Sequence, residues 1–591
     1  MTSSFTSTFG PEEHGEDRRI FRLWAPSATS VSLELLRGDR LAEQVEMKRS
    51  DGGGSYNAEW YRSEVLDAPA GTRYAFRING DLLVPDPASR MQDSDVHGYS
   101  VVVGSSPADT SRWRNHPWHA TVIYEAHVGT ATPRGTFASL QERLPYLADL
   151  GVTVLELLPA ADFPGPRNWG YDGVLPFAPD RSYGSPGDLK ALVNAAHDHG
   201  IAVWMDVVYN HFGPDGNYLH VYCDHFFSES IPTPWGAGID FSQPLVRRFF
   251  IENALYWIHE FGIDGLRLDA VHAIHDSTEP HILTELSKTV RDSLPAHRHV
   301  HLVLENDANQ ARFLRSPAKY EAQWNDDIHH VLHVLLTGEN HGYYRDFARD
   351  TDAKLLRALT EGYVFQGERS SAHNGTPRGE VSRDLSTTKF ISFLQNHDQI
   401  GNRAWGDRLA ALTDPAALAA AEALLLLSPQ IPMIFMGEEW HSTTPFLFFC
   451  AFEGELAQAV RDGRRREFGL DDLPDPGAPE TFTSSVLETP GDSHRYRELL
   501  HLRRTHLQPL LPAMRSGTGG GGGSQALSVR YPSDGTLWCI DVNLSDRSRP
   551  RREEPFSGAH HRRKAIYRSS PDRPWSDVMG PWSIDVWSDV L

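Results

Sequence analysis

Two kinds of hydrophobic pattern divide the chain. Residues 31–35 (Val-Ser-Leu-Glu-Leu) alternate apolar and polar side chains, and residues 74–78 (Tyr-Ala-Phe-Arg-Ile) lead into an Asn79-Gly80 turn. Alternation with a period of two is typical of strands that bury one face, and Asn-Gly is typical of a tight hairpin turn. With Gly52–Gly54 as a loop, the pattern predicts an immunoglobulin-like N-terminal β-sandwich over residues 1–108.

Beyond residue 118 the pattern changes to short, continuous apolar runs separated by helical patterns. Continuous apolar runs are typical of strands buried on both faces, and the helices between them indicate a parallel sheet. Eight runs are present, which is the number that closes a (β/α)8 barrel. The predicted fold class is therefore α/β, with a (β/α)8 TIM barrel over residues 109–511. The eight runs are residues 122–126, 152–158, 202–208, 265–269, 301–305, 320–324, 390–395 and 431–436.

Two long insertions interrupt the predicted barrel. Residues 212–241 and 443–470 follow the third and eighth runs and are too long for ordinary loops, so both are expected at the carboxyl-end mouth of the barrel. A helix is predicted directly after the first insertion. We expect Ser242 as its N-cap, Pro244 in its first turn and Gly262 as its C-terminal stop.

The C-terminal part of the chain returns to a β pattern. Residues 498–511 are predicted to form the last barrel helix. The tract Gly517–Ser524 contains five consecutive glycines, which we interpret as a flexible linker, native or engineered. Residues 527–531 and 537–542 then predict a small antiparallel β domain over residues 512–591.

A charged pair stands within the fourth apolar run. Arg267 and Asp269 share one face of this predicted strand. Burying a carboxylate between aliphatic residues costs free energy unless a partner or a function requires it. A lone Arg-x-Asp is more often a structural pair, but three other segments also carry carboxylates at predicted strand ends. These are residues 206–211, 302–307 and 395–399.

The order, strand context and spacing of these four segments resemble the signature regions of the α-amylase-type glycoside hydrolases (family 13). The resemblance extends from about residue 120 to residue 511, and it also supports the sixth run, whose own periodicity is weak. Within that family, residues 394–409 (LQNHDQIGNRAWGDRL), 436–468 and 322–339 resemble the maltooligosyltrehalose trehalohydrolases. Residues 21–26 (FRLWAP) resemble the start of N-terminal sandwich domains that belong to the carbohydrate-binding modules of branching and debranching relatives. Such a domain either holds polysaccharide or packs against the catalytic domain.

Three carboxylates are the candidate catalytic groups. Retaining hydrolysis needs two carboxyl groups about 5–5.5 Å apart, one nucleophilic and one protonated. We assign Asp269 as the nucleophile, which Arg267 on the same strand face keeps ionised. Glu305 ends an apolar run, where desolvation raises a carboxyl pKa, and we assign it as the general acid/base. The resemblance implies that Asp398 holds the hydroxyl groups of the distorted sugar and helps to arrange Glu305, while His397 donates to the same sugar.

The resemblance also implies further substrate contacts. Asp206 corresponds to the aspartate that pairs with Arg267, and His211 corresponds to a histidine that touches the sugar. Tyr171, next to Trp169, corresponds to an aromatic platform beneath it. Other residues at strand ends or near the nucleophile are candidates for contacts on the leaving-group side: His127, His272, Trp324 and Asp326.

No metal or other cofactor is predicted. Asn210 binds calcium in some relatives, but no cluster of oxygen ligands accompanies it here. His272 and His275 have a spacing that suits a metal pair, although histidines on a helix surface are far commoner.

The composition indicates which partners and which compartment are expected for this protein. The chain has 591 residues and a formal net charge of −22, which excludes polyanionic partners such as nucleic acid. Its three cysteines show no disulfide or zinc spacing, and we see neither a signal peptide nor an apolar run long enough for a membrane. We therefore expect a cytoplasmic enzyme without membrane association.

The implied reaction is retaining hydrolysis of the α-1,4 bond between a maltooligosyl chain and terminal trehalose. The implied ligands are maltooligosyltrehalose, trehalose and maltooligosaccharides, with maltooligosyltrehalose synthase as the pathway partner. Two alternatives stay open at this point. One is an α-glucan branching or debranching enzyme on the same scaffold. The other is an inactive glucan-binding barrel, which the presence of all three carboxylates disfavours.

Overall fold

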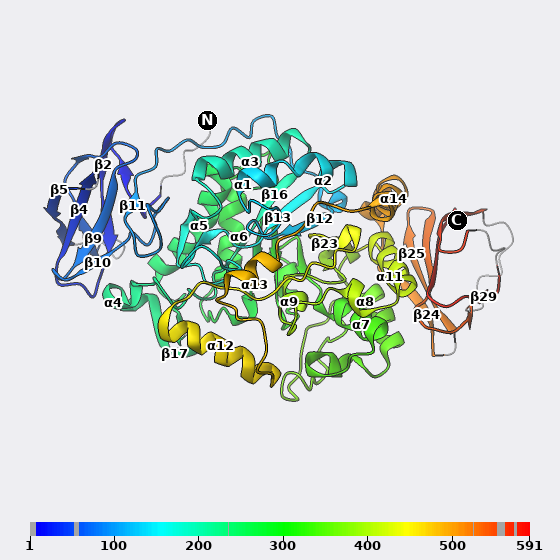
Figure 1. The fold of residues 1–591 in the computed structure, drawn as a ribbon. Coiled ribbons are helices and arrows are strands. Elements are labelled where there is room, and N and C mark those ends of the chain that lie inside the picture. The colour runs from blue at the N-terminus through cyan, green and yellow to red at the C-terminus, as the bar shows by residue number, and fades with distance from the viewer. Residues whose placement is uncertain are drawn as a thin grey trace.

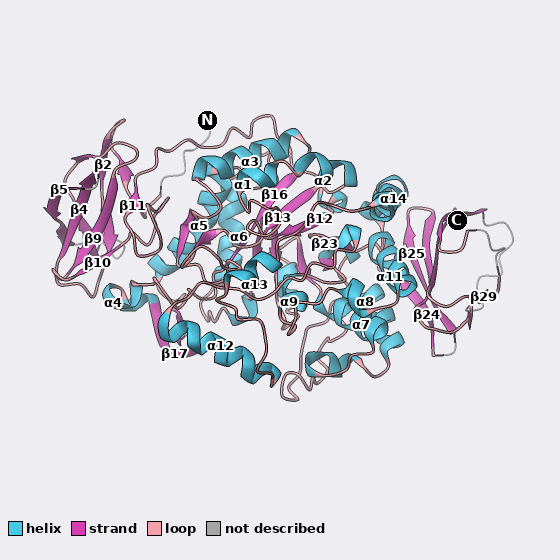
Figure 2. Cartoon of the chain, in the orientation of Figure 1, coloured by secondary structure: helices cyan, strands magenta, loops and turns pink. Residues whose placement is uncertain are grey.

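The computed structural model describes residues 7–38, 40–51, 58–233, 236–523, 525–551, 562–571 and 576–590. It consists of a helix-covered barrel with a β domain at each end (Figures 1 and 2). The expected Gly52–Gly54 loop lies outside the described residues. The predicted fold class is confirmed, and we propose residues 1–108, 109–511 and 512–591 as the three domains.

The N-terminal domain consists of antiparallel strands around an apolar core. Strand β9 pairs with β4 and β10, and β7 pairs with β3 and β6. Phe21, Leu33, Tyr74 and Phe76 are fully buried between these strands. The strands are β1 (Glu12–Glu13), β2 (Arg18–Ile20), β3 (Arg22–Trp24), β4 (Val31–Arg37), β5 (Arg40–Glu46), β6 (Lys48–Asp51), β7 (Ala58–Arg62), β8 (Leu66–Asp67), β9 (Arg73–Ile78), β10 (Leu82–Val84) and β11 (Ser100–Val101).

This domain packs against the barrel domain. Phe9 meets Phe249 edge to face at 5.1 Å, and the Arg90 guanidinium lies 4.2 Å from the centre of the Tyr256 ring. The Thr8 amide donates to Glu252 Oε2 at 2.7 Å. The contacts combine aromatic packing with a hydrogen bond, and they fix the domain against the barrel domain.

The eight barrel strands are all parallel and close into a ring, as predicted. They are β12 (Ile123–Ala126), β13 (Val154–Leu157), β16 (Ala202–Val207), β19 (Gly265–Leu268), β20 (His301–Leu304), β21 (Ala322–Trp324), β22 (Phe390–Ser392) and β23 (Ile431–Phe435). The ring closes through pairing of β12 with β23. The main covering helices are α1 (Phe137–Gln141), α2 (Leu144–Leu150), α3 (Pro186–Asp198), α5 (Pro244–Glu260), α6 (Ile282–Ser293), α7 (Asp326–Thr337), α8 (Thr351–Glu361), α11 (Pro415–Leu427) and α14 (His494–Leu502).

Side chains fill the barrel in layers, and the upper layer is polar. The apolar layer includes Ile123, Val154, Trp204 and Val303, each fully buried. Because strand side chains alternate, the residue two positions further along each strand points to the same side, one step nearer the carboxyl end. Those residues are Glu125, Glu156, Asp206 and Glu305. The geometry of the strands therefore gathers carboxyl groups at one end of the ring.

The cap of α5 differs from our prediction. Gln243, not Ser242, occupies the N-cap position, and its side chain makes no capping hydrogen bond to the helix. The Ser242 hydroxyl is instead bonded to Asp240 Oδ1 at 2.6 Å, in a turn that precedes the helix. Pro244 begins the helix as expected, and Gly262 follows its end with φ +78°.

Both insertions carry structure of their own. The first contains α4 (Leu219–Tyr222) and a hairpin of β17 (Phe227–Thr233) and β18 (Gly236–Ile239). The second contains α12 (Gly454–Phe468). In the view of Figure 1, β17 and α12 both appear at the lower left of the barrel. Within the described residues, none of the helices is both long and apolar enough to span a membrane.

The interpretation of the glycine tract as a linker is wrong. Residues Thr518–Gly522 form β24, an edge strand that pairs with β25 (Gln525–Ser533) in a sheet with β26 (Thr536–Asn543), β30 (Ser583–Val590) and β28 (Arg562–Arg568). A Cβ on Gly519 would lie 2.8 Å from Leu356 Cδ1 in α8, and a Cβ on Gly521 would lie 2.1 Å from the Ala526 carbonyl oxygen. Glycine is thus required for close packing and not for flexibility.

We expect Gly521→Ala to destabilise the protein by about 3 kcal/mol, which would lower its midpoint of urea denaturation. Gly521 has φ +103°, and its Cβ would collide with backbone. The control is Gly535→Ala in the turn between β25 and β26, where φ is +74° and nothing lies within 4 Å of the new Cβ. It should cost only about 1 kcal/mol. Equal midpoints for the two variants would contradict this account of the tract.

Candidate active site

A buried arginine organises the polar end of the barrel. The Arg267 side chain is fully buried, and its Nη1 donates to Asp269 Oδ1 at 2.7 Å and to Asp206 Oδ2 at 2.8 Å. The guanidinium lies 4.1 Å from the centre of the Trp324 ring, which supports it from below. Burial alone would lower the pKa of Arg267, but the negative charges around it, first that of Asp206, raise the pKa well above its ordinary value. Arg267 is therefore a fixed positive charge.

Asp269 is held as a carboxylate. Its Oδ2 accepts a hydrogen bond from Asn210 Nδ2 at 2.9 Å, in addition to the bond from Arg267. Burial opposes ionisation, but the Arg267 charge, His211 and the Asn210 bond outweigh it, so the pKa of Asp269 lies below its ordinary value. The side chain remains 13% exposed, so a substrate can reach it.

Glu305 has the opposite electrostatic balance. Its Oε2 accepts a hydrogen bond from the Ala270 amide at 2.6 Å and lies 3.9 Å from Arg267 Nη2. Burial raises the pKa of Glu305 above its ordinary value, although Arg267 and His272 oppose the shift. Ala270 adopts a left-handed conformation with φ +40°, which a residue with a side chain rarely does. Ala270 directly follows Asp269 in the chain, and its amide donates to Glu305. The carboxyl groups of Asp269 and Glu305 are therefore neighbours.

His397 and Asp398 begin α9 (His397–Gly401), just after β22. His397 Nδ1 lies 2.6 Å from Glu125 Oε1, and Nε2 lies 3.5 Å from Asp398 Oδ2. The Asp398 side chain is 46% exposed, while that of His397 is 2% exposed. Asp398 is thus the most accessible of the three candidate carboxylates.

Aromatic rings enclose His397. The Tyr171 ring stacks on it at 5.0 Å, and the Tyr171 hydroxyl donates to Asp206 Oδ2 at 2.6 Å. Trp169 meets His397 edge to face from a buried position, where its indole N–H donates to the Leu447 carbonyl. His211 Nε2 donates to the Tyr171 carbonyl at 3.0 Å. Tyr171 therefore links the Arg267 and His397 groups.

The remaining candidates lie around this centre. His127 is buried, with Nε2 2.9 Å from the Asn168 carbonyl oxygen, and burial lowers its pKa to about 4. Trp324 lies buried beneath Arg267. Asp326 starts α7, and burial followed by the charges of Glu305 and Asp307 raises its pKa well above the ordinary value. His272 is exposed at the rim, where its Nδ1 accepts from the Asp307 amide.

Two polar residues of this site were not among our predicted contacts. Asn210 contacts Asp269 directly, and Glu125 contacts His397. Glu156 stands beside Glu125 in the strand register, but both of its carboxyl oxygens lack a hydrogen-bond partner in the described part of the chain. The available signal for Glu125 was a glutamate inside an otherwise apolar run, because an ionisable residue in a buried strand needs a partner. The described residues contain no group of three or more His, Cys, Asp and Glu side chains that could hold a metal ion.

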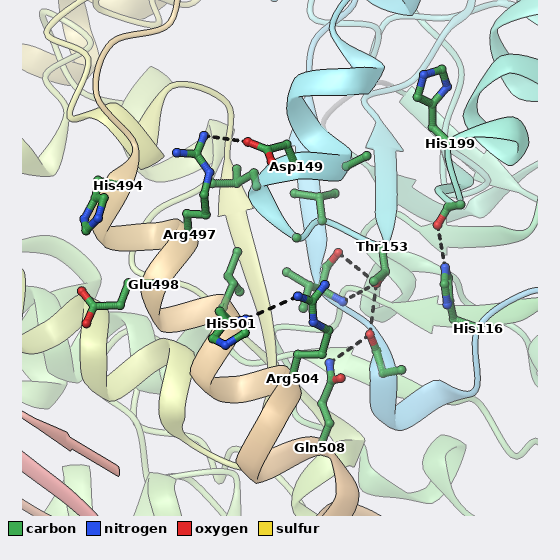
Figure 3. A pocket seen from close by; sticks show the side chains of 18 residues that line it. His116, Asp149, Thr153, His199, His494, Arg497, Glu498, His501, Arg504 and Gln508 are labelled. Carbon is green, nitrogen blue, oxygen red and sulfur yellow. Dashed lines mark hydrogen bonds and ion pairs between the residues drawn. The ribbon is translucent and has the colours of Figure 1, made fainter.

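A cavity of about 810 Å³ lies at the opposite end of the barrel. Val122, Val152 and Thr153 line it just at the amino ends of β12 and β13, facing α14 (Figure 3). Its two acidic residues do not converge: Asp149 pairs with Arg497 at 3.0 Å, and Figure 3 shows Glu498 turned away from Asp149. The cavity therefore lacks the pair of facing carboxyl groups that glycoside hydrolysis needs.

Comparison with known proteins agrees with this geometry. Residues 88–225 match the family model of the α-amylase catalytic domain, and residues 8–88 match carbohydrate-binding module 48, the isoamylase N-terminal domain. A putative α-amylase from Salmonella typhimurium has a solved structure with a TM-score of 0.92 and 40% identity, covering 99% of this chain and all of that one. A pullulanase from Bacillus subtilis superposes with a TM-score of 0.70 at 18% identity over 99% of this chain and 86% of its own, which shows only the shared fold.

Several similar curated proteins are malto-oligosyltrehalose trehalohydrolases. The malto-oligosyltrehalose trehalohydrolase of Saccharolobus solfataricus is 43% identical over 484 residues, which is 80% of this chain and 82% of that protein. That of Deinococcus radiodurans is 40% identical, over 82% of this chain and 80% of that protein. By contrast, a 1,4-alpha-glucan branching enzyme of Mycobacterium tuberculosis matches at 34% over 42% of this chain and 36% of that protein.

A closed parallel barrel with carboxylates at the ends of strands four, five and seven defines a glycoside hydrolase of the α-amylase type. Within that class, the sequence identity to these relatives over most of both chains shows which family the chain belongs to. The chain belongs to the malto-oligosyltrehalose trehalohydrolase family.

Proposed function

We propose that this chain hydrolyses the α-1,4 bond between a maltooligosyl chain and terminal trehalose, and so releases trehalose. Its substrate is then maltooligosyltrehalose, supplied by a synthase that builds the terminal trehalose unit, and its other product is a shortened maltooligosaccharide. Its three cysteines are buried and have no disulfide or zinc spacing in the sequence, which favours a reducing compartment such as the cytoplasm.

The observation that carries the proposal is the position of Arg267. This buried cation bonds to Asp269 and lies 3.9 Å from Glu305, so it lowers the pKa of one carboxyl group while burial raises that of the other. A retaining glycoside hydrolase needs this division between an ionised nucleophile and a protonated acid.

The reaction then has two steps. Glu305 donates its proton to the glycosidic oxygen as trehalose departs, and Asp269 forms an ester with the anomeric carbon of the maltooligosyl chain. Glu305, now ionised, takes a proton from water. This water attacks the anomeric carbon, the ester bond breaks, and Asp269 becomes a free carboxylate again.

Incubation of the purified chain with maltooligosyltrehalose tests the function. We expect one free trehalose for each bond cleaved and no new α-1,6 branches, because the branching enzyme of Mycobacterium tuberculosis resembles less than half of this chain. Formation of branches without net release of trehalose would favour the branching alternative.

The pH profile of kcat/KM is expected to be bell-shaped. Activity should fall as the pH drops through the pKa of Asp269, which is lowered from that of an ordinary aspartate. It should also fall as the pH rises through the pKa of Glu305, which is raised from that of an ordinary glutamate. Asn210→Ala removes a donor to Asp269, so it should move the acidic limb upward by about 0.5–1 unit. Asn402→Ala is the matched control, because Asn402 donates instead to Asp398. An acidic limb that moves equally in both variants would contradict the role of Asn210.

A further inference from the structure

A carboxylate that the substrate cannot reach holds His397 from inside the barrel. Glu125 Oε1 lies 2.6 Å from His397 Nδ1, and its Oε2 accepts from the His397 amide at 3.3 Å. The side chains of Glu125 and His397 are 1% and 2% exposed. Glu125 lies on the first strand of the barrel and His397 just beyond the seventh, so only closure of the ring brings them together.

The contacts of His397 leave one ring nitrogen for a ligand. Nδ1 donates to Glu125, while Nε2 faces the half-exposed Asp398 at 3.5 Å. Tyr171 stacks on the ring at an interplanar angle of 21°, and Trp169 meets it edge to face. The ring therefore has a single orientation, with Nε2 toward the accessible carboxylate.

We propose that Glu125 is a positioning residue that keeps His397 as an imidazolium, so that its Nε2–H donates to the sugar at the cleavage point. The proposal rests on the proposed hydrolysis, because it concerns the sugar bound between Asp269 and Asp398. Glu125 acts through His397 and does not itself touch the substrate.

The surrounding charges support the imidazolium. His397 is faced by Asp398 beside it, by Arg267 on β19, and by four groups on neighbouring elements: Glu125, Glu156, Asp206 and His127. Burial alone would lower the pKa of His397, and Arg267 also lowers it. The charges of Asp398 and Glu125 outweigh both and raise the pKa to about 9.

Glu156 provides a matched control. It pairs with Glu125 in the register of β12 and β13, and both of its buried carboxyl oxygens lack a hydrogen-bond partner in the described part of the chain. Burial, and then the charges of Glu125 and Asp206, raise the pKa of Glu156 well above its ordinary value, which favours its uncharged form. Glutamine has nearly the size and the charge of that form, so Glu156→Gln is a conservative change at the neighbouring strand position.

The test compares Glu125→Gln, Glu125→Asp and Glu156→Gln by trehalose release from maltooligosyltrehalose across pH. We expect Glu125→Gln to lower kcat about 10–100-fold at neutral pH, with KM changed less than about threefold and activity partly regained at lower pH. Glu125→Asp retains the charge and should retain most of the wild-type pH profile. Glu156→Gln should keep kcat within about twofold and the profile unchanged. The proposal fails if Glu125→Gln keeps the wild-type profile, or if Glu156→Gln shifts it to the same extent.

A second measurement needs neither substrate nor a variant of Glu125. NMR titration of histidine ring-labelled wild-type protein, with the His397 signal assigned by its loss in His397→Asn, should show a pKa of His397 near 9. A value below about 7, near that of an unperturbed histidine, would overturn the proposal. If His397 titrates as expected but no trehalose is released, the role of Glu125 in holding the imidazolium stands and the proposed hydrolysis fails.

Discussion

Replacing Asp269 with asparagine is expected to lower kcat for trehalose release by at least about 10⁴-fold. The amide has no anionic oxygen that can form an ester with the anomeric carbon. The neutral side chain keeps the size of the aspartate, and Arg267 still has Asp206 as a partner at 2.8 Å, so the protein should remain folded. Trehalose appearing from maltooligosyltrehalose measures the loss, and the thermal unfolding midpoint checks the fold.

The matched control is Asp149→Asn. Asp149 also pairs with an arginine, Arg497, but it lies in the cavity at the far end of the barrel (Figure 3). It should keep kcat within about twofold, as surface substitutions usually do. If Asp269→Asn retained activity within tenfold of the wild type, Asp269 would not be the nucleophile.

Replacing Glu305 with glutamine is expected to lower kcat with maltooligosyltrehalose by about 10³-fold, within the range that general acid–base catalysis contributes. Glutamine can neither protonate the departing trehalose nor take a proton from the attacking water. In this variant the alkaline limb of the pH profile, which we assign to Glu305, should also disappear.

A maltooligosyl fluoride separates the two carboxyl roles, because fluoride departs without a proton. Glu305→Gln should release a burst of about one fluoride per active site, since Asp269 still forms the ester but its hydrolysis is slow. Asp269→Asn should give no burst. A burst from neither variant, or bursts of equal size from both, would contradict the assignment of the two roles.

Much of the barrel could be predicted because it depends on local patterns. Each of the eight predicted runs contains a strand, but six of these strands end before the carboxyl end of the run. The run 390–395, for example, holds only β22 (Phe390–Ser392). The extra apolar residues Phe393 and Leu394 are buried after the strand has ended, so a hydrophobic pattern cannot distinguish them from strand residues.

The two wrong local predictions share a cause. Ser242 has a side chain that suits an N-cap, but its hydroxyl donates to Asp240 in a turn before the helix. The glycine tract has the composition of a linker, but β25 and α8 approach it too closely for side chains. The composition of a segment gives its local conformational preference, and packing against distant segments can override that preference.

The sequence by itself determined the barrel, the flanking β domains and the three carboxylates that our proposal makes catalytic, because periodicity and strand position are local properties. Only the tertiary structure decided which polar groups meet. Asn210 reaches Asp269, the strained Ala270 amide reaches Glu305, and Glu125 reaches His397 across 272 residues of chain. Assembly of the eight strands into a barrel sets these contacts, and it thereby sets which carboxyl pKa is lowered and which is raised.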